Sequence, residues 1–130
     1  MFTAAGISQD ELHAALCDMG PPPKKGVDLW QPERPSIGYC YVVSEVVSYQ
    51  MKRRGVPHKT YRLDCGNGDS HWFIRLGKDA LGEIIDLTAD QIDGTFDYEK
   101  GKSRGFQKNG HMKYGLSKAA EKLAGKLNLL

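Results

Sequence analysis

The stretch that most constrains the fold of this chain is residues 40–53. It contains no glycine or proline, and apolar side chains recur along it at helical spacing, at Val43, Val46, Val47 and Met51. A glycine and a proline follow it closely, and both residue types end helices. We therefore expect one central, buried helix, around which the rest of the chain must pack.

Three strand-like segments follow this helix. Residues 58–64 (HKTYRLD) and 70–76 (SHWFIRL) flank Gly66, Asn67 and Gly68, which is a strong hairpin signal. A third segment, residues 82–88 (GEIIDLT), comes after a further turn. A helix followed by an antiparallel meander predicts an α+β fold, in which the central helix packs on a small antiparallel sheet.

Helical patterns also lie at both ends of the chain. Ser8 and Glu11 have the spacing of a capping box, which predicts a helix over residues 7–19. Three consecutive prolines then begin an irregular arm that runs to residue 38, so that residues 1–29 hold the N-terminal helix and the proline-rich arm. The apolar spacing in residues 116–130 predicts a closing helix.

Two shorter segments separate the expected sheet from the closing helix. Residues 88–92 predict one helical turn, capped by Thr88. Residues 93–110 are glycine-rich and charged, and they predict a basic surface loop.

Length and composition fit a single folded domain over residues 1–130. Apolar residues make up 40% and charged residues 26%, which suits a packed core. The formal net charge of +2 is smaller than the strongly positive charge expected of a dedicated nucleic-acid binder. No apolar run approaches the roughly 18 residues that a membrane-spanning helix needs. We therefore expect no membrane partner, and the charge disfavours nucleic acid as a partner.

Three widely spaced cysteines, Cys17, Cys40 and Cys65, contain no C-x-x-C pair. This pattern favours free thiols in a reducing, cytoplasmic compartment over disulfides or a zinc site. His13, His58 and His111 share no metal-ligand spacing with one another or with the cysteines. No phosphate-binding loop follows a strand. We therefore expect no metal and no cofactor. Cys17 is interpreted as a packing residue of the first helix, and Cys65 as an incidental thiol at the hairpin tip.

Cys40 is the candidate nucleophile, because it begins the central helix. Unpaired backbone N–H groups and the helix dipole stabilise a thiolate at that position. The same N–H groups can donate to an oxyanion that develops on a substrate carbonyl. The alternative is that Cys40 is a small, inert residue of the hydrophobic core.

A cysteine nucleophile needs a base and a residue that orients the base. His71 is the candidate base, at the start of the strand 70–76. If this strand pairs with residues 82–87, opposed residue numbers add up to about 157, which places Asp86 opposite His71. The alternatives are a structural histidine and an aspartate that only caps the turn at Thr88. A convergence of all three residues would favour a Cys-His-Asp triad.

Four segments together resemble a known family over residues 30–125. They are WQPERPSIGYC, SHWFIRL, GEIIDLTADQI and HMKYGLSKAAEKL, and they resemble the YunG-like group of small bacterial and phage proteins. That group is similar to transglutaminase-like and papain-like cysteine enzymes, in which Cys, His and Asp follow in this chain order. The resemblance implies a papain-like core, with Cys40, His71 and Asp86 as nucleophile, base and orienter.

One position departs from the family pattern. Members place glutamine directly before the cysteine, where this chain has Tyr39. Gln31 or Ser36 is the substitute polar donor that the sequence offers. Trp30, Gln31 and Tyr39 are the candidate substrate-binding residues, because they lie in the arm that leads to Cys40.

The leading hypothesis is a cysteine hydrolase or acyltransferase. It would act on an amide or ester through a thioester intermediate, as a protease, deamidase or transglutaminase-like enzyme, with a protein or peptide substrate. The alternative is a non-catalytic protein-binding module that keeps the fold and docks through the basic residues 100–108. Nucleic-acid binding through Lys52, Arg53, Arg54 and the same basic residues 100–108 is a weaker hypothesis, because few aromatic residues lie among those charges.

Overall fold

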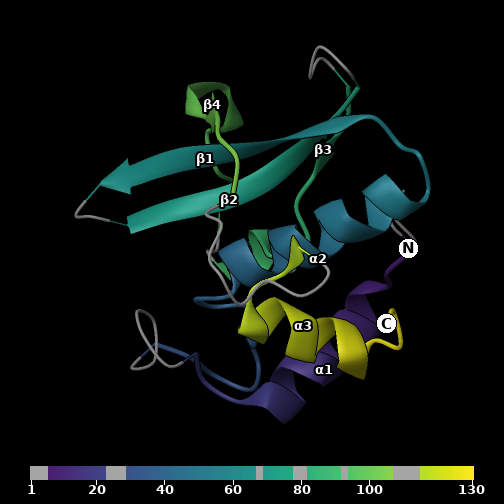
Figure 1. Cartoon of the computed structure of the whole chain (residues 1–130). Coiled ribbons are helices and arrows are strands. Elements are labelled where there is room, and N and C mark those ends of the chain that lie inside the picture. Colours follow the sequence, from purple (N-terminus) through teal and green to yellow (C-terminus); the bar gives the residue numbers. More distant parts are fainter. Residues whose placement is uncertain (1–5, 23–28, 67–68, 78–81, 92–93, 107–114) are drawn as a thin grey trace.

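The fold is α+β, with three α-helices and a four-stranded antiparallel sheet in the described part of the chain (Figure 1). The structure is a computed structural model of the chain. It describes residues 6–22, 29–66, 69–77, 82–91, 94–106 and 115–130.

The central helix is α2 (Cys40–Arg53), with the bounds that the sequence predicted. It lies between the sheet on one side and the helices α1 (Gln9–Met19) and α3 (Lys118–Lys126) on the other (Figure 1). Its predicted apolar residues are buried, and they join one core cluster with residues of both outer helices and of the sheet. Burying each such aliphatic side chain contributes roughly 1.5–3 kcal/mol. In the described helices, no segment is both long and apolar enough to cross a bilayer.

The first helix begins as its capping pattern indicated. The Ser8 hydroxyl accepts a hydrogen bond from the Glu11 N–H at 3.1 Å. This contact satisfies one of the N–H groups that have no acceptor within the helix. The helix ends at Met19 before Gly20, which has a φ of 76°.

The closing helix is shorter than predicted. It begins after Ser117, whose hydroxyl accepts from the Ala120 N–H at 3.3 Å, and it ends at Lys126 instead of continuing to residue 130. Asn128 adopts the left-handed conformation with a φ of 59°. Its N–H donates to the Gly125 carbonyl, and the Leu129 N–H donates to the Ala124 carbonyl. This Schellman arrangement satisfies terminal carbonyls and stops the helix.

A buried carboxylate fixes the start of α3 on α2. Glu45 is 2% exposed, and it accepts hydrogen bonds from the Ser117 N–H at 2.9 Å and the Ser117 hydroxyl at 2.8 Å. Burial raises the pKa of Glu45, and the two bonds from Ser117 oppose that rise. The contact joins two helices that are far apart in the sequence.

The sheet has the order β3-β2-β1-β4. The predicted hairpin is formed by β1 (His58–Gly66) and β2 (Asp69–Leu76), in a register that pairs Leu63 with His71. The third strand, β3 (Ile84–Ile85), pairs with β2, and β4 (Lys102–Ser103) pairs with β1. The expected three-stranded meander is therefore extended by one edge strand.

The third strand is shorter than predicted, and its register differs. Ile85 pairs with Ile74, whereas the predicted register would have paired it with Trp72. Asp86 therefore lies just beyond the paired region. Because side chains alternate between the faces of a strand, a shift of two residues keeps Asp86 on the face of the sheet that carries His71.

The segment predicted as a basic surface loop over residues 93–110 is mostly exposed in its described part, and it also contains two short elements. Residues Tyr98–Lys100 form a 3₁₀ turn, and β4 follows directly. Tyr98 packs edge-on against Phe73, with 4.9 Å between ring centroids. A Cβ at Gly101 would lie 2.7 Å from the Phe73 ring, so that this close approach requires glycine. Aromatic packing on the sheet orders the segment.

Candidate active site

Cys40 is the first residue of α2, at the end of the helix that approaches the sheet. Tyr39 occupies the N-cap position, and its side chain makes no capping hydrogen bond. The first N–H groups of a helix have no acceptor within that helix, so they are the natural donors beside the Cys40 sulfur. Cys40 is 9% exposed, and its Sγ lies 3.7 Å from the Ser70 carbonyl oxygen on β2.

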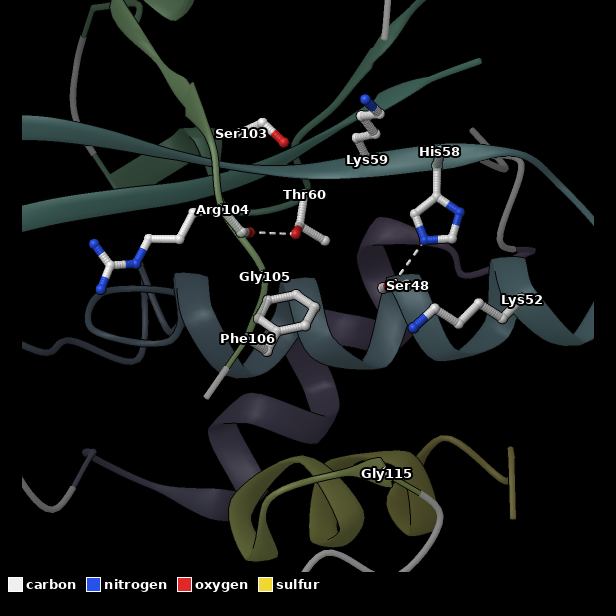
Figure 2. A pocket seen from close by; sticks show the side chains of 10 residues that line it. All are labelled: Ser48, Lys52, His58, Lys59, Thr60, Ser103, Arg104, Gly105, Phe106 and Gly115. Atoms are coloured by element: carbon white, nitrogen blue, oxygen red, sulfur yellow. Dashed lines mark hydrogen bonds between the residues drawn. The ribbon is translucent and has the colours of Figure 1, made fainter. Parts of the chain in front are cut away.

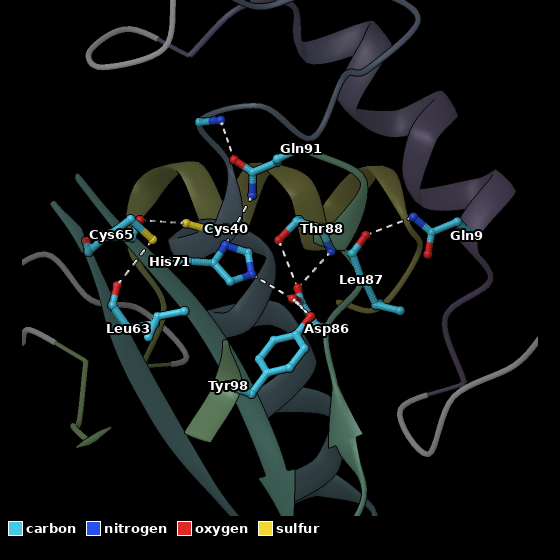
Figure 3. Close-up of polar contacts among 12 residues, drawn as sticks. Gln9, Cys40, Leu63, Cys65, His71, Asp86, Leu87, Thr88, Gln91 and Tyr98 are labelled. Atoms are coloured by element: carbon cyan, nitrogen blue, oxygen red, sulfur yellow. Dashed lines mark hydrogen bonds and ion pairs between the residues drawn. The ribbon is translucent and has the colours of Figure 1, made fainter. Parts of the chain in front are cut away.

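The His71 side chain is held by two contacts, with Asp86 just beyond β3 and with the Phe96 ring. Its Nε2 lies 2.6 Å from Asp86 Oδ2, and the side chain is 2% exposed (Figure 3). The Phe96 ring stacks on the imidazole with 3.7 Å between centroids and an interplanar angle of 6°. The ring plane is therefore fixed by packing, and the ring rotation is fixed by the carboxylate.

Asp86 uses both carboxylate oxygens. Oδ1 accepts from the backbone N–H and the hydroxyl of Thr88, each at 3.2 Å. Oδ2 accepts from His71 and from the Tyr98 hydroxyl, each at 2.6 Å. Asp86 therefore both caps the turn at Thr88 and is hydrogen-bonded to His71, as the two interpretations of this residue stated.

The electrostatics of His71 favour its charged form. Burial opposes protonation, but hydrogen bonds and charge attraction involving Asp86 and Cys40 outweigh it and raise the pKa of His71 to about 9. Because Asp86 holds Nε2, the proton that can move is on Nδ1, the ring nitrogen on the Cys40 side (Figure 3). Burial and the Asp86 carboxylate raise the pKa of Tyr98, which keeps its hydroxyl a donor.

This pKa predicts how stability depends on pH. A histidine in an unfolded chain titrates near 6.5, so the contribution of protonated His71 is complete below that pH and is lost as the pH rises through about 9. We expect the free energy of unfolding to fall by up to about 3 kcal/mol across this interval. Urea unfolding at several pH values measures it. In a His71→Gln variant the slope between these pH values should be largely absent, and an unchanged slope would contradict the assignment.

A glutamine completes the polar surroundings of Cys40 and His71. Gln91 ends the 3₁₀ turn Ala89–Gln91, which lies within the turn predicted over residues 88–92. Its Oε1 accepts from the Gly38 N–H at 3.2 Å, and its Nε2 lies 3.5 Å from His71 Nδ1. Gly38 has a φ of 82°, a conformation that favours glycine. The loop before α2 and the turn after β3 thus meet above the imidazole.

The structure brings together Cys40, His71 and Asp86, but it directs the three candidate substrate-binding residues elsewhere. Tyr39 is 3% exposed, and its hydroxyl donates to the Gly20 carbonyl at 2.6 Å. Trp30 Nε1 donates to the Pro35 carbonyl at 3.0 Å. Gln31 is exposed in a backbone bridge with Arg34. The alternative donor Ser36 is buried.

All three cysteines lie in described parts of the chain, and none is disulfide-bonded. The interpretation of Cys17 as a packing residue was wrong, because the side chain is exposed and donates to the Pro32 carbonyl at 3.4 Å. Cys65 is also exposed. No three His, Cys, Asp or Glu side chains gather as metal ligands within the described ranges.

A separate pocket of about 430 Å³ lies between α2, the strand β1 and the residues that follow β4 (Figure 2). Ser48 and His58 face each other in it at 2.7 Å. His58 Nδ1 lies 2.9 Å from the Val56 carbonyl, which supports a structural contact between helix and strand. None of the three triad candidates lines the pocket.

Sequence reasoning missed the supporting residues of the site. Phe96 and Tyr98 lay in the segment that was predicted as a loop, although two aromatic residues at a spacing of two, in an otherwise polar stretch, are a signal of packing. Gln91 entered only through the family resemblance. Nothing in its local sequence indicates that it reaches Gly38.

Comparisons with family models, with curated proteins and with solved structures returned no match to this chain. The resemblance to the YunG-like group therefore stays a prediction. Functional conclusions depend on the geometry of the site.

Proposed function

We propose that this protein is a cysteine hydrolase or acyltransferase that uses Cys40 as nucleophile, His71 as acid and base, and Asp86 as the residue that orients His71. The observation that carries the proposal is the position of His71. Asp86 binds one ring nitrogen of His71. The side chains that interact electrostatically with the His71 ring are Asp86 and Cys40. A buried histidine with only a structural role does not need both partners.

The chemistry follows from this arrangement. His71 is protonated on Nδ1 and pairs with the Cys40 thiolate, which attacks the carbonyl carbon of an amide or ester. The carbonyl electron pair moves to oxygen and returns as the leaving group departs. A leaving amine takes the proton from Nδ1. Water or an amine then attacks the thioester, with Nδ1 as base, and Cys40 is regenerated. Asp86 holds Nε2 throughout.

The fold supports the same proposal. A helix that begins with the nucleophile packs on an antiparallel sheet that supplies the histidine and, just beyond β3, the aspartate. This chain order, Cys then His then Asp, is that of papain-like and transglutaminase-like enzymes, which the sequence resembles. A protein or peptide substrate is part of the proposal.

The test uses p-nitrophenyl acetate, an activated ester that needs no specific substrate pocket. We expect a burst of p-nitrophenolate and a mass increase of one acetyl group on Cys40. The Cys40→Ala variant should lose this acylation entirely, whereas Cys17→Ala and Cys65→Ala, which remove exposed thiols, should retain it. Equal acylation of the Cys40→Ala variant and the wild type would refute the proposal.

A further inference from the structure

We infer that Gln91 is an oxyanion donor of this site, with its Nε2 group binding the carbonyl oxygen of the substrate as negative charge develops there. The inference rests on the proposed function and adds a catalytic residue to it. It also supplies the polar donor that the sequence pattern lacked, since Tyr39 stands directly before the nucleophile and points its hydroxyl at Gly20.

The orientation of the Gln91 amide is set by its neighbours. The Gly38 N–H can only donate, so the atom 3.2 Å from it must be the amide oxygen. The NH₂ group consequently points to the other side, toward the imidazole nitrogen that faces Cys40 (Figure 3). A donor that is fixed before the reaction costs no reorganisation during it.

The NH₂ group is also available to a substrate. Its 3.5 Å contact with His71 Nδ1 is at the outer limit of hydrogen bonding, so little is lost when it is given up. In the pair of protonated His71 and Cys40 thiolate, Nδ1 carries the proton, so it is a donor and cannot accept from Gln91. This N–H is therefore free before the oxyanion forms.

The Cys40 N–H provides the second donor. It lies at the first position of α2, where backbone N–H groups have no intrahelical acceptor. In the attack, the C–S bond forms while the carbonyl electron pair moves to oxygen between these two donors. The pair then returns to re-form the carbonyl, and p-nitrophenolate leaves with its bonding electrons when the ester is p-nitrophenyl acetate.

The experiment compares two reactions of Cys40 in wild-type protein and in Gln91→Ala. Acylation by p-nitrophenyl acetate passes through an oxyanion, whereas alkylation by iodoacetamide displaces iodide and forms none. We expect the acylation rate to fall about 10²-fold and the alkylation rate to stay within about two-fold of wild type. The Gly38 N–H that the variant leaves without this acceptor belongs to an exposed residue, so folding should be retained.

Two further variants sharpen the result. Gln91→Glu keeps an acceptor for the Gly38 N–H but brings negative charge toward the oxyanion, so its acylation should be slower than that of Gln91→Ala. Gln9→Ala is the matched control, because the Gln9 amide donates at 2.8 Å to the carbonyl of Leu87, beside Asp86, without contacting the site. Its acylation rate should stay within about two-fold of wild type.

The outcomes separate the two proposals. If wild-type Cys40 is not acylated at all, the proposed function fails, and the role of Gln91 fails with it. If wild-type Cys40 is acylated and Gln91→Ala is equally fast, only the role of Gln91 is overturned. An equal loss of acylation and alkylation overturns it too, because it would show that Gln91 merely positions the thiol or the imidazole.

Discussion

His71→Gln should slow acylation of Cys40 by p-nitrophenyl acetate by about 10²–10⁴-fold at pH 7, the usual contribution of a positioned acid and base. Glutamine is close to histidine in size, and its amide can still donate to Asp86, so the buried position stays filled. It cannot take the thiol proton, because an amide nitrogen has no basic lone pair. Burst kinetics of p-nitrophenolate release measure the effect.

The matched control is His58→Gln. His58 is also a partly buried strand histidine, with a 2.7 Å contact to Ser48, but it lies on the opposite face of the sheet from His71 and lines the separate pocket. Its replacement should leave the burst rate within about two-fold of wild type. Equal rates for wild type and His71→Gln would remove His71 from the reaction.

Asp86→Ala should lower the free energy of unfolding by about 3–5 kcal/mol, the usual cost of removing one partner of a buried charged pair. The carboxylate accepts four hydrogen bonds, from His71, Tyr98 and two groups of Thr88. Alanine leaves these donors without an acceptor, and it leaves a protonated His71 without its counter-charge. Urea unfolding with a shared m-value measures the loss.

Asp86→Asn separates stability from catalysis. Asparagine keeps an oxygen for Thr88, but its NH₂ group faces His71 and stabilises the tautomer whose Nδ1 carries the proton. That ring cannot take the Cys40 proton, so acylation should fall by about 10⁴-fold, whereas stability should fall less than in Asp86→Ala. The control Asp97→Ala removes an exposed carboxylate with a 3.7 Å contact to Lys100, and it should cost under about 1 kcal/mol. Similar unfolding energies for Asp86→Ala and Asp97→Ala would contradict the geometry.

The fold was predictable where local signals and burial agree. The central helix has its predicted bounds because an apolar stripe without glycine or proline coincides with the buried face. The two strands of the hairpin pair as predicted because the sequence between them carries a strong turn signal. The end of α3 was not predictable from apolar spacing, since a left-handed Asn128 stops the helix while the pattern continues.

The edge strand and its aromatic residues show the limit of local patterns. β4 consists of two exposed residues, and its pairing depends on β1, about forty residues earlier in the chain. Phe96 and Tyr98 gain their burial from His71 and Phe73, which no property of the segment itself reveals. The segment therefore resembled a loop.

The site was partly predictable for a similar reason. The pairing of His71 with Asp86 required only a local turn, and an error of two residues in register kept both on one face. The approach of Gln91 to Gly38 joins two loops far apart in the sequence, and neither loop has a periodicity that fixes its direction. Positions of substrate-binding residues in the arm before Cys40 were inferred from proximity in sequence, which does not determine where a side chain points.

The most direct test of the central claim is a competition among the three thiols for iodoacetamide at pH 6.5, read by mass spectrometry of the labelled peptides. Cys40 is buried, whereas Cys17 and Cys65 are exposed, so accessibility alone would make Cys40 the slowest. Pairing of the Cys40 sulfur with His71 reverses this order in the mechanism that we propose, and we predict that Cys40 is labelled first and that His71→Gln abolishes its lead. Labelling of Cys40 after both exposed thiols in the wild-type protein would contradict the account.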